Sequence, residues 1–147
     1  MAPISKDPIS ETELASRLRL VVTRLARRLR TQSPGELSPS QLATLSSVER
    51  LGPLTLGELS NAEQVKPPTM TKIVACLEEQ GLVSRTVDRS DRRVARVEAT
   101  PAGHGFLDSS RKQKDAYLAE RLRSLDPADR VTLQNAARVL ERFLEDG

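Results

Sequence analysis

The sequence has few of the residues that metal sites, disulfides and enzyme active sites require. Its 147 residues include one cysteine, Cys76, and one histidine, His104, which excludes an internal disulfide and disfavours most His/Cys metal sites. Aromatic residues make up only 2% of the chain, so the core must consist of aliphatic side chains, which suits packed helices. We find no glycine-rich phosphate loop and no nucleophile motif. We therefore predict that the chain is not an enzyme and holds no metal or cofactor.

Long apolar runs are also missing from the sequence. No segment approaches the roughly 20 apolar residues of a membrane-spanning helix, and residues 1–9 are too short and polar for a signal peptide. Together with the single cysteine, this predicts a cytoplasmic protein with no membrane partner. The length suits one domain, or one domain with an appendage.

The net charge is concentrated in one short segment. The whole chain has 23 basic and 20 acidic residues, a formal net charge of +3. Residues 82–97 hold five arginines and two aspartates, which is also +3. The remainder, 23 − 5 = 18 basic and 20 − 2 = 18 acidic residues, cancels. This segment therefore accounts for the whole excess of positive charge.

The basic segment follows directly after a predicted helix over residues 67–80. Its proline pair suits a first helical turn, Gly81 provides a left-handed stop, and residues 82–87 and 94–99 read as strands joined by a turn over 88–93. Met70, Ile73, Val74 and Leu77 share one face of the helix. Thr69, Thr71 and Lys72 lie mainly on the other side. A polar helix start beside a basic hairpin is typical of proteins that place one element in a DNA groove and another on phosphates.

The rest of the chain reads as further helices. Side chains suited to helix N-caps stand at Ser10, Ser38, Thr55 and Thr100. The predicted helices cover residues 10–30, 38–51, 56–63, 101–124 and 126–146. Residues 1–9 read as a loose tail, Ser33-Pro34-Gly35 as a break, and Pro53-Leu54 as an extended link.

Two short helices in succession, 56–63 and 67–80, predict a helix-turn-helix, and the hairpin behind them makes it a winged helix. The predicted fold class is mostly α with a small β-hairpin wing. We divide the chain into an N-terminal tail and dimerisation helix (1–37), a winged helix-turn-helix domain (38–99) and C-terminal dimerisation helices (100–147). The flanking helices carry more apolar surface than the middle domain can bury, which predicts that they pack against a second copy of the chain.

The segment DRSDRRVARVEATPAG, from Asp88 to Gly103, resembles the wing signature of the MarR family of transcriptional regulators. The helices before it and the run EEQGLVSR agree with that resemblance, which covers nearly the whole chain. It implies a homodimer with two recognition helices in successive major grooves, acting as a repressor that a small ligand or an oxidant relieves. The family often has serine before the first proline of the recognition helix, where this chain has Lys66.

The candidate DNA-binding residues come from the helix start and the wing. We expect Thr69 and Thr71 to meet base edges, and Lys72 to reach phosphate or guanine. Arginines of a projecting loop fit a narrow minor groove, although Asp91 is expected to hold Arg89 or Arg93 for structural reasons. The full set is Lys66, Pro68, Thr69, Thr71, Lys72, Arg85, Arg89, Asp91, Arg92 and Arg93. An ordinary solvated helix start and hairpin tip are the alternative interpretation.

Two functions remain open at this point. The first is a homodimeric, sequence-specific regulator of double-stranded DNA, with helix 67–80 in the major groove and wing 87–95 in the minor groove of a pseudo-palindromic operator. A small-molecule effector would then be a further partner. The alternative is a winged-helix protein-interaction module whose basic hairpin docks an acidic partner without sequence-specific DNA binding.

The remaining candidate residues receive structural interpretations. We expect Cys76 to be a buried, inert thiol, and His104 to be a surface or interface residue. The arginines of residues 17–30 are interpreted as a solvated or inter-subunit face that the acidic last helix complements. Tyr117 is a candidate for the wall of an effector cavity between the dimerisation helices and the winged helix.

Overall fold

A computed structural model describes residues 7–33, 35 and 37–147 of the chain. The tail predicted for residues 1–9 is described only from residue 7, and Pro34 of the predicted break also lies outside the described residues. The predicted fold class is confirmed, with helices predominating and a small antiparallel sheet. The elements in chain order are α1 (Glu11–Thr31), α2 (Pro39–Leu51), β1 (Leu54–Thr55), α3 (Leu56–Glu63), α4 (Pro67–Glu79), β2 (Val83–Val87), β3 (Ala95–Ala99), α5 (Pro101–Arg123) and α6 (Pro127–Glu145).

The helix boundaries follow the capping residues in the sequence. At four helix starts a hydroxyl accepts a hydrogen bond from the backbone N–H three residues ahead, which satisfies a donor that the helix itself leaves unpaired. These caps are Ser10, Ser38, Thr55 and Thr100. The predicted helix 67–80 ends at Glu79, and Gly81 follows with a φ of +73°, a conformation that glycine adopts without steric cost.

The sheet has three strands rather than the two predicted. Residues 53–54 were predicted to be an extended link, but Leu54 and Thr55 form β1 and pair with Val97 and Arg96 of β3. A two-residue strand is too short to show an alternating pattern, so its partner has to be known before it can be recognised. The antiparallel order β1-β3-β2 makes β3 the central strand and leaves β2 at the edge.

The buried core lies in the winged helix and includes the first turns of α5. Its fully buried aliphatic residues come from α2, α3, α4 and the sheet, and Leu107 adds one residue of α5. Glu49 of α2 accepts hydrogen bonds from two α5 residues, Arg111 at 2.8 Å and His104 at 2.9 Å. These contacts hold the beginning of α5 against α2. His104 is therefore an exposed residue of the domain surface that contacts Glu49.

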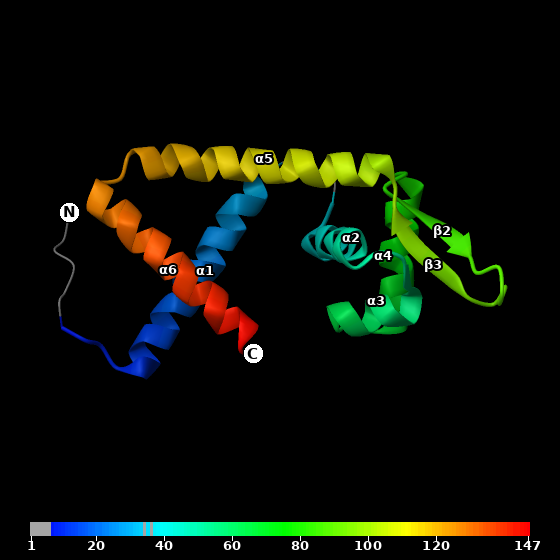
Figure 1. Cartoon of the computed structure of the whole chain (residues 1–147), viewed down its shortest axis with the longest axis horizontal. Helices are drawn as coiled ribbons and strands as arrows, with labels where there is room; N and C mark the ends of the chain where they lie inside the picture. The colour runs from blue at the N-terminus through cyan, green and yellow to red at the C-terminus, as the bar shows by residue number, and fades with distance from the viewer. Residues whose placement is uncertain (1–6, 34, 36) are drawn as a thin grey trace.

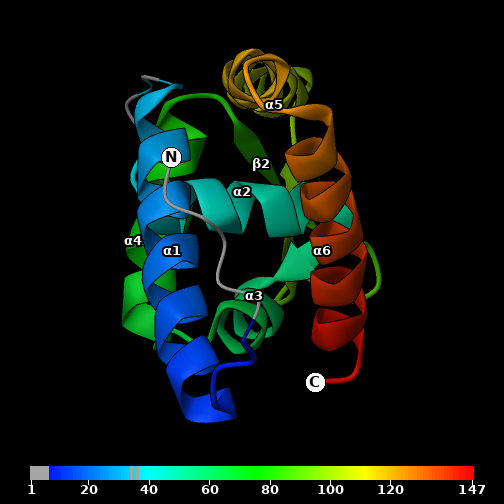
Figure 2. The same cartoon turned by 90° about the vertical axis from the view of Figure 1, so that its left-hand side faces the viewer.

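Helix α5 connects this winged helix to two helices at its other end. Figure 1 shows α5 as a long rod with α2, α3, α4 and the hairpin at one end and α1 and α6 at the other. Helices α1 and α6 overlap in that view, but Figure 2 shows them apart, on opposite sides of the molecule. Neither α1 nor α6 contains a buried residue. No helix of the described ranges is both long and apolar enough to cross a membrane.

Candidate nucleic-acid interface

Helix α4 divides into a buried face and an exposed face. Met70, Ile73, Val74 and Leu77 are buried in the core, as their spacing predicted. The candidate residues of the N-cap and first turns point away from the core and are exposed: Lys66, Pro68, Thr69, Thr71 and Lys72. The helix start therefore offers its polar side chains to a partner outside the domain.

For two of these residues, Lys66 and Thr71, contacts within the helix determine which groups remain free for a partner. Lys66 occupies the N-cap position without a side-chain hydrogen bond to the helix, so its ammonium group is available to a partner. The Thr71 hydroxyl donates to the Pro67 carbonyl at 3.0 Å. Thr71 consequently presents its methyl group and an acceptor lone pair to the outside, while its proton is used within the helix.

The wing is built around Asp88, which organises the loop between β2 and β3. Oδ1 of Asp88 accepts from the Ser90 hydroxyl at 2.6 Å and from the Ser90 and Asp91 N–H groups at 2.8 and 3.3 Å. Its Oδ2 accepts from Nη1 of Arg96 at 2.5 Å. The bond from the Ser90 hydroxyl, followed by those from Arg96 and from the Ser90 N–H, holds the pKa of Asp88 well below its usual range.

Backbone hydrogen bonds close the same loop. The Asp88 N–H donates to the Val94 carbonyl at 2.8 Å, and the Val94 N–H donates to the Asp91 carbonyl at 3.0 Å. The wing tip is therefore ordered by its own hydrogen bonds before any partner binds. Such preorganisation lowers the entropic cost of binding.

Asp91 pairs with Arg93, one of the two partners predicted for it. Its Oδ1 accepts from the backbone N–H and from Nε of Arg93, both at 3.1 Å. The bond from the Arg93 side chain, followed by that from its backbone, lowers the pKa of the Asp91 carboxyl. The Arg93 side chain remains 91% exposed, so the pair orients the guanidinium without removing it from solvent.

The other wing arginines differ in their freedom. Arg89 and Arg92 are exposed, and neither forms an ion pair with any residue that the structure describes. Arg85 instead contacts Glu78 of α4, with 3.2 Å between Nε and Oε2. The predicted set thus comprises an exposed helix start, an exposed wing tip, and Arg85 between them.

Asp88, Ser90 and Arg96 were not identified from the sequence, although their hydrogen bonds organise the wing. The Asp88-x-Ser90 spacing at the start of a loop is typical of an Asx-turn and was a usable signal for part of it. The Asp88–Arg96 pair had no such signal, because the two residues meet only after β2 and β3 pair in register.

Cys76 is partly buried rather than fully buried. Its sulfur accepts hydrogen bonds from the side-chain amides of Gln41 at 3.2 Å and Gln80 at 3.4 Å. These contacts join α4 to the beginning of α2.

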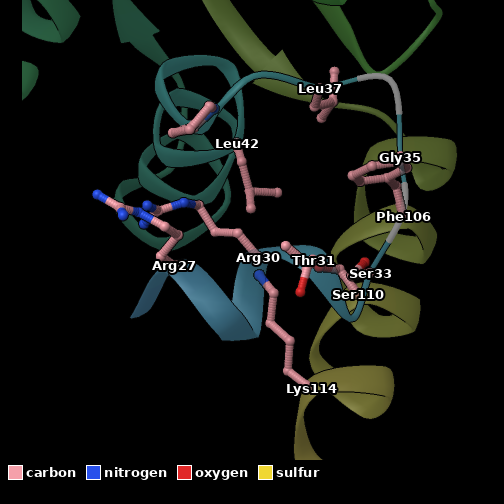
Figure 3. A pocket seen from close by; sticks show the side chains of 11 residues that line it. Arg27, Arg30, Thr31, Ser33, Gly35, Leu37, Leu42, Phe106, Ser110 and Lys114 are labelled. Atoms are coloured by element: carbon pink, nitrogen blue, oxygen red, sulfur yellow. The ribbon is translucent and has the colours of Figure 1, made fainter. Parts of the chain in front are cut away.

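A cavity of about 210 Å³ lies where α1, the beginning of α2 and α5 meet. Figure 3 shows Lys114 reaching from α5 toward Thr31 at the end of α1, and the Phe106 ring beside Gly35. Its described lining residues are Arg27, Arg30, Thr31, Ser33, Gly35, Leu37, Pro39, Leu42, Phe106, Ser110 and Lys114. Tyr117, which we expected in such a wall, does not line this cavity. Its ring lies 5.2 Å from the Arg121 guanidinium carbon.

Comparisons with known proteins agree with this architecture. An HTH-type transcriptional regulator of Mycobacterium leprae is 36% identical over 138 residues, covering 93% of this chain and 96% of that protein. The crystal structure of a candidate transcriptional regulator from Pseudomonas aeruginosa has a TM-score of 0.82 and 31% identity, covering 93% of this chain and 98% of that one.

A third relative has the same fold at lower identity. FabT of Streptococcus pneumoniae, solved in complex with DNA, has a TM-score of 0.67 and 18% identity, covering 93% of this chain and 99% of that one. The family model for MarR proteins matches residues 37–95, from just before α2 to the beginning of β3. The chain belongs to the MarR family of transcriptional regulators, which are not enzymes.

Proposed function

We propose that this chain is a homodimeric regulator that binds a specific double-stranded DNA operator and represses transcription until a small ligand releases it. The observation that carries the proposal is an exposed, threonine- and lysine-bearing helix start beside a basic wing tip ordered by its own hydrogen bonds. Family membership supports DNA as the partner, as does the DNA-bound state of FabT, which has the same fold. A single free cysteine fits action in the reducing cytoplasm.

In this proposal α4 enters the major groove and wing 87–95 follows the adjacent minor groove. Thr69 supplies a hydroxyl to a base edge, while Thr71 supplies its methyl group to a thymine. The wing arginines enter the minor groove, which attracts cations most strongly where it is narrow. The proposed contacts are Lys66, Pro68, Thr69, Thr71, Lys72, Arg89, Arg92 and Arg93, with Asp91 orienting Arg93.

Dimerisation through both ends of the chain is supported by the unburied apolar surface of α1 and α6. Five large apolar residues along one face of α1 are 41–55% exposed, and Phe143 and Leu144 of α6 are 76% and 78% exposed. Helices of this length gain most of their stability in water from packing one apolar face. A second copy of the chain buries these faces, with 1–37 and 100–147 as dimerisation segments and 38–99 as the DNA-binding domain.

Charge also favours pairing between these terminal segments. Helix α1 carries six arginines against two glutamates, while residues 126–147 carry three arginines against five acids, a net of −2. A two-fold dimer presents two copies of α4, so the operator should be a pseudo-palindrome with half-sites about 10 base pairs apart, one turn of the duplex.

The cavity beside α5 supports the ligand part of the proposal. Arg27, Arg30 and Lys114 place three cationic side chains around it, and Leu42 and Phe106 add apolar surface. This combination fits a small anion with an apolar or aromatic body. Because the cavity joins α1 and α2 to α5, an occupant that changes their packing also changes the separation of the two recognition helices.

The deciding experiment is selection of random-sequence duplexes by the purified protein, together with its mass in solution. The proposal predicts a two-fold symmetric motif and a dimer mass of 2 × 16.2 kDa, with affinity that falls steeply as salt rises. Absence of any enriched motif, with retention on an acidic protein resin that duplex DNA does not displace, would instead favour the protein-interaction module. A monomeric mass would contradict the dimer.

The ligand is tested with benzoate as an anionic aromatic probe and benzyl alcohol as its uncharged counterpart. Release of the selected operator should require millimolar benzoate or less, resist benzyl alcohol at the same concentration, and weaken in Lys114→Ala. Lys112→Ala is the matched control, because Lys112 lies on α5 outside the cavity lining. Equal release by both compounds would refute an anion-selective cavity.

A further inference from the structure

The wing is attached to the core mainly at its base. In β2, Val83 is 2% exposed and buried, whereas the four residues that follow it, Ser84 to Val87, are all exposed. Strand β2 is also the edge of the sheet, with β3 as its single neighbour. Strand β3 is held further along, by the burial of Val97 at 1% exposure and by its pairing with β1 as far as Arg96. Beyond Val83, β2 and the wing tip therefore project from the domain without buried residues of their own.

One ion pair holds this projecting part against α4. Arg85 stands two residues beyond Val83 and opposite Val97, so its side chain shares the face of the hairpin that bears these two core residues. Its Nε lies 3.2 Å from Oε2 of Glu78, in the last turn of α4. Among the described residues, this is the only side-chain hydrogen bond or ion pair that joins α4 to β2 or β3.

The exposure of the wing arginines agrees with different roles for them. The Arg93 side chain at the tip is 91% exposed, whereas that of Arg85 is 33% exposed. The Arg85 guanidinium is turned toward the recognition helix and already has an anionic partner, which a phosphate would have to displace.

We propose that Glu78 and Arg85 form a positioning pair that fixes the wing relative to the recognition helix, and that Arg85 does not contact DNA. The inference rests on the proposed function, in which α4 and the wing occupy neighbouring grooves. A wing of fixed direction loses less conformational freedom on binding than a mobile one. Arg85, predicted from the sequence to be a DNA contact, thereby acts through the placement of Arg92 and Arg93.

One substitution should change the affinity for DNA in opposite directions under this proposal and under simple electrostatics. Glu78→Gln removes a negative charge near the DNA, which by charge alone strengthens binding. A positioning pair predicts the opposite, a loss of about two- to five-fold, because an exposed ion pair contributes modestly. Glu79→Gln is the matched control, since Glu79 is a neighbouring exposed glutamate outside every ion pair of the described residues. It should bind the selected operator at least as tightly as the parent.

The salt dependence of binding tests the role of Arg85. Loss of a phosphate contact reduces the slope of log affinity against log salt by about one. We expect Arg85→Gln to weaken binding about two- to five-fold with an unchanged slope, and Arg92→Gln to lower the slope. The double variant Glu78→Gln/Arg85→Gln should bind no more weakly than the weaker single variant. A lower slope for Arg85→Gln would overturn the proposal.

Amide hydrogen exchange of the free protein provides a readout without DNA. Both Glu78→Gln and Arg85→Gln should speed exchange in β2 about two- to five-fold, Glu79→Gln should not, and the charge swap Glu78→Arg/Arg85→Glu should restore slow exchange. Parental exchange in both single variants would overturn the pair. If the parent protein selects no operator, the proposed function fails, while the exchange data still decide whether the pair positions the wing.

Discussion

At Gly103, α5 comes very close to the backbone at the start of the hairpin. A Cβ atom there would lie 2.2 Å from the Leu82 carbonyl oxygen and 3.3 Å from Cδ1 of Leu45. The Leu82 oxygen is also the acceptor for the Thr100 N–H at 3.1 Å. The carbonyl therefore cannot move aside without disturbing the junction between the hairpin and α5. Only glycine permits this close approach, which sets where α5 leaves the winged helix.

We predict that Gly103→Ala lowers the free energy of unfolding by about 1–3 kcal/mol, the usual cost of overpacking. Gly105→Ala is the matched control two residues further along α5, where an added Cβ meets nothing within 4 Å. That substitution should be neutral or stabilise by up to about 1 kcal/mol, because alanine favours helix more than glycine does. Urea unfolding of the two variants measures both effects, and equal stability would contradict the close approach.

Asp88 fixes the conformation of the wing loop through its hydrogen bonds. We predict that Asp88→Ala weakens operator binding about five-fold, since Arg96 and two backbone N–H groups lose their acceptor and the loop must be ordered on binding. Asp91→Ala is the control within the same loop and removes only the contacts to Arg93. Asp91→Ala should weaken operator binding less than Asp88→Ala does. Titration of the selected operator measures the difference, and an equal loss in both variants would be inconsistent with a central part for Asp88.

The lowered pKa of Asp88 also gives this prediction a pH dependence. A carboxyl whose pKa is depressed by folding contributes stability above its unfolded pKa of about 3.9, and that contribution is lost as pH falls through the folded value. The Asp88 contribution should therefore be constant from pH 5 to 8 and decline in acid. The unfolding midpoint of Asp88→Asn should fall less steeply than that of the parent below about pH 4, whereas parallel profiles would contradict this assignment.

At the scale of elements, helix α4 and the hairpin form the two halves of the proposed interface. The exposed first turns of α4 carry groups suited to base edges, whereas the wing tip carries Arg89 and Arg92, which form no ion pair with any described residue. This division predicts that substitutions in the two elements affect different properties of binding. Changes at Thr69 should alter the selected motif, and changes at Arg92 should alter affinity for every sequence.

We predict that Arg92→Ala weakens binding to matched and mismatched operators by about the same factor and reduces the salt slope by about one. The arginine is exposed and has no ion-pair partner among the described residues, so its loss leaves the fold intact. Lys112→Ala removes one positive charge from α5 and serves as the control, with an unchanged slope. An Arg92→Ala variant with parental affinity and slope would place the wing away from DNA.

At the scale of the whole molecule, α5 connects a core-containing end to an end without a core of its own. Leu14, Leu18, Val21, Val22 and Leu25 form a stripe on α1 at helical spacing, and all are exposed. Figure 1 and Figure 2 together show α1 and α6 extending from the α5 region without packing closely on each other. In the proposed dimer a second chain covers this end, so folding and dimerisation should be coupled.

We predict that Leu18→Glu, in the apolar stripe of α1, converts the dimer to a species of 16.2 kDa and removes operator binding. A buried charge at a dimer interface has no compensating partner there. Leu20→Glu is the control, because Leu20 is 50% exposed on the opposite, arginine-bearing side of the helix. Light scattering and circular dichroism measure mass and helix content, and a dimeric Leu18→Glu protein would refute this interface.

Local patterns were sufficient to predict most of the elements and one of the ion pairs in the wing. The caps at Ser38, Thr55 and Thr100, the prolines at first helical turns and the stop at Gly81 act within a few residues of chain. The Asp91–Arg93 pair is equally local and was among the expected alternatives. Such features depend on hydrogen bonds and dihedral preferences of neighbouring residues, which a sequence displays directly.

The sequence alone therefore determined the order of helices, the basic wing and the exposed helix start, because short-range physics and charge composition decide them. Only the tertiary structure decided that Leu54–Thr55 joins the sheet, that Asp88 meets Arg96, and that Arg85 faces Glu78. The same holds for the cavity beside Phe106 and for the requirement for glycine at position 103. Each of these depends on strand register or on the packing of α5 against distant segments, and residues far apart in a sequence carry no local signal of their contact.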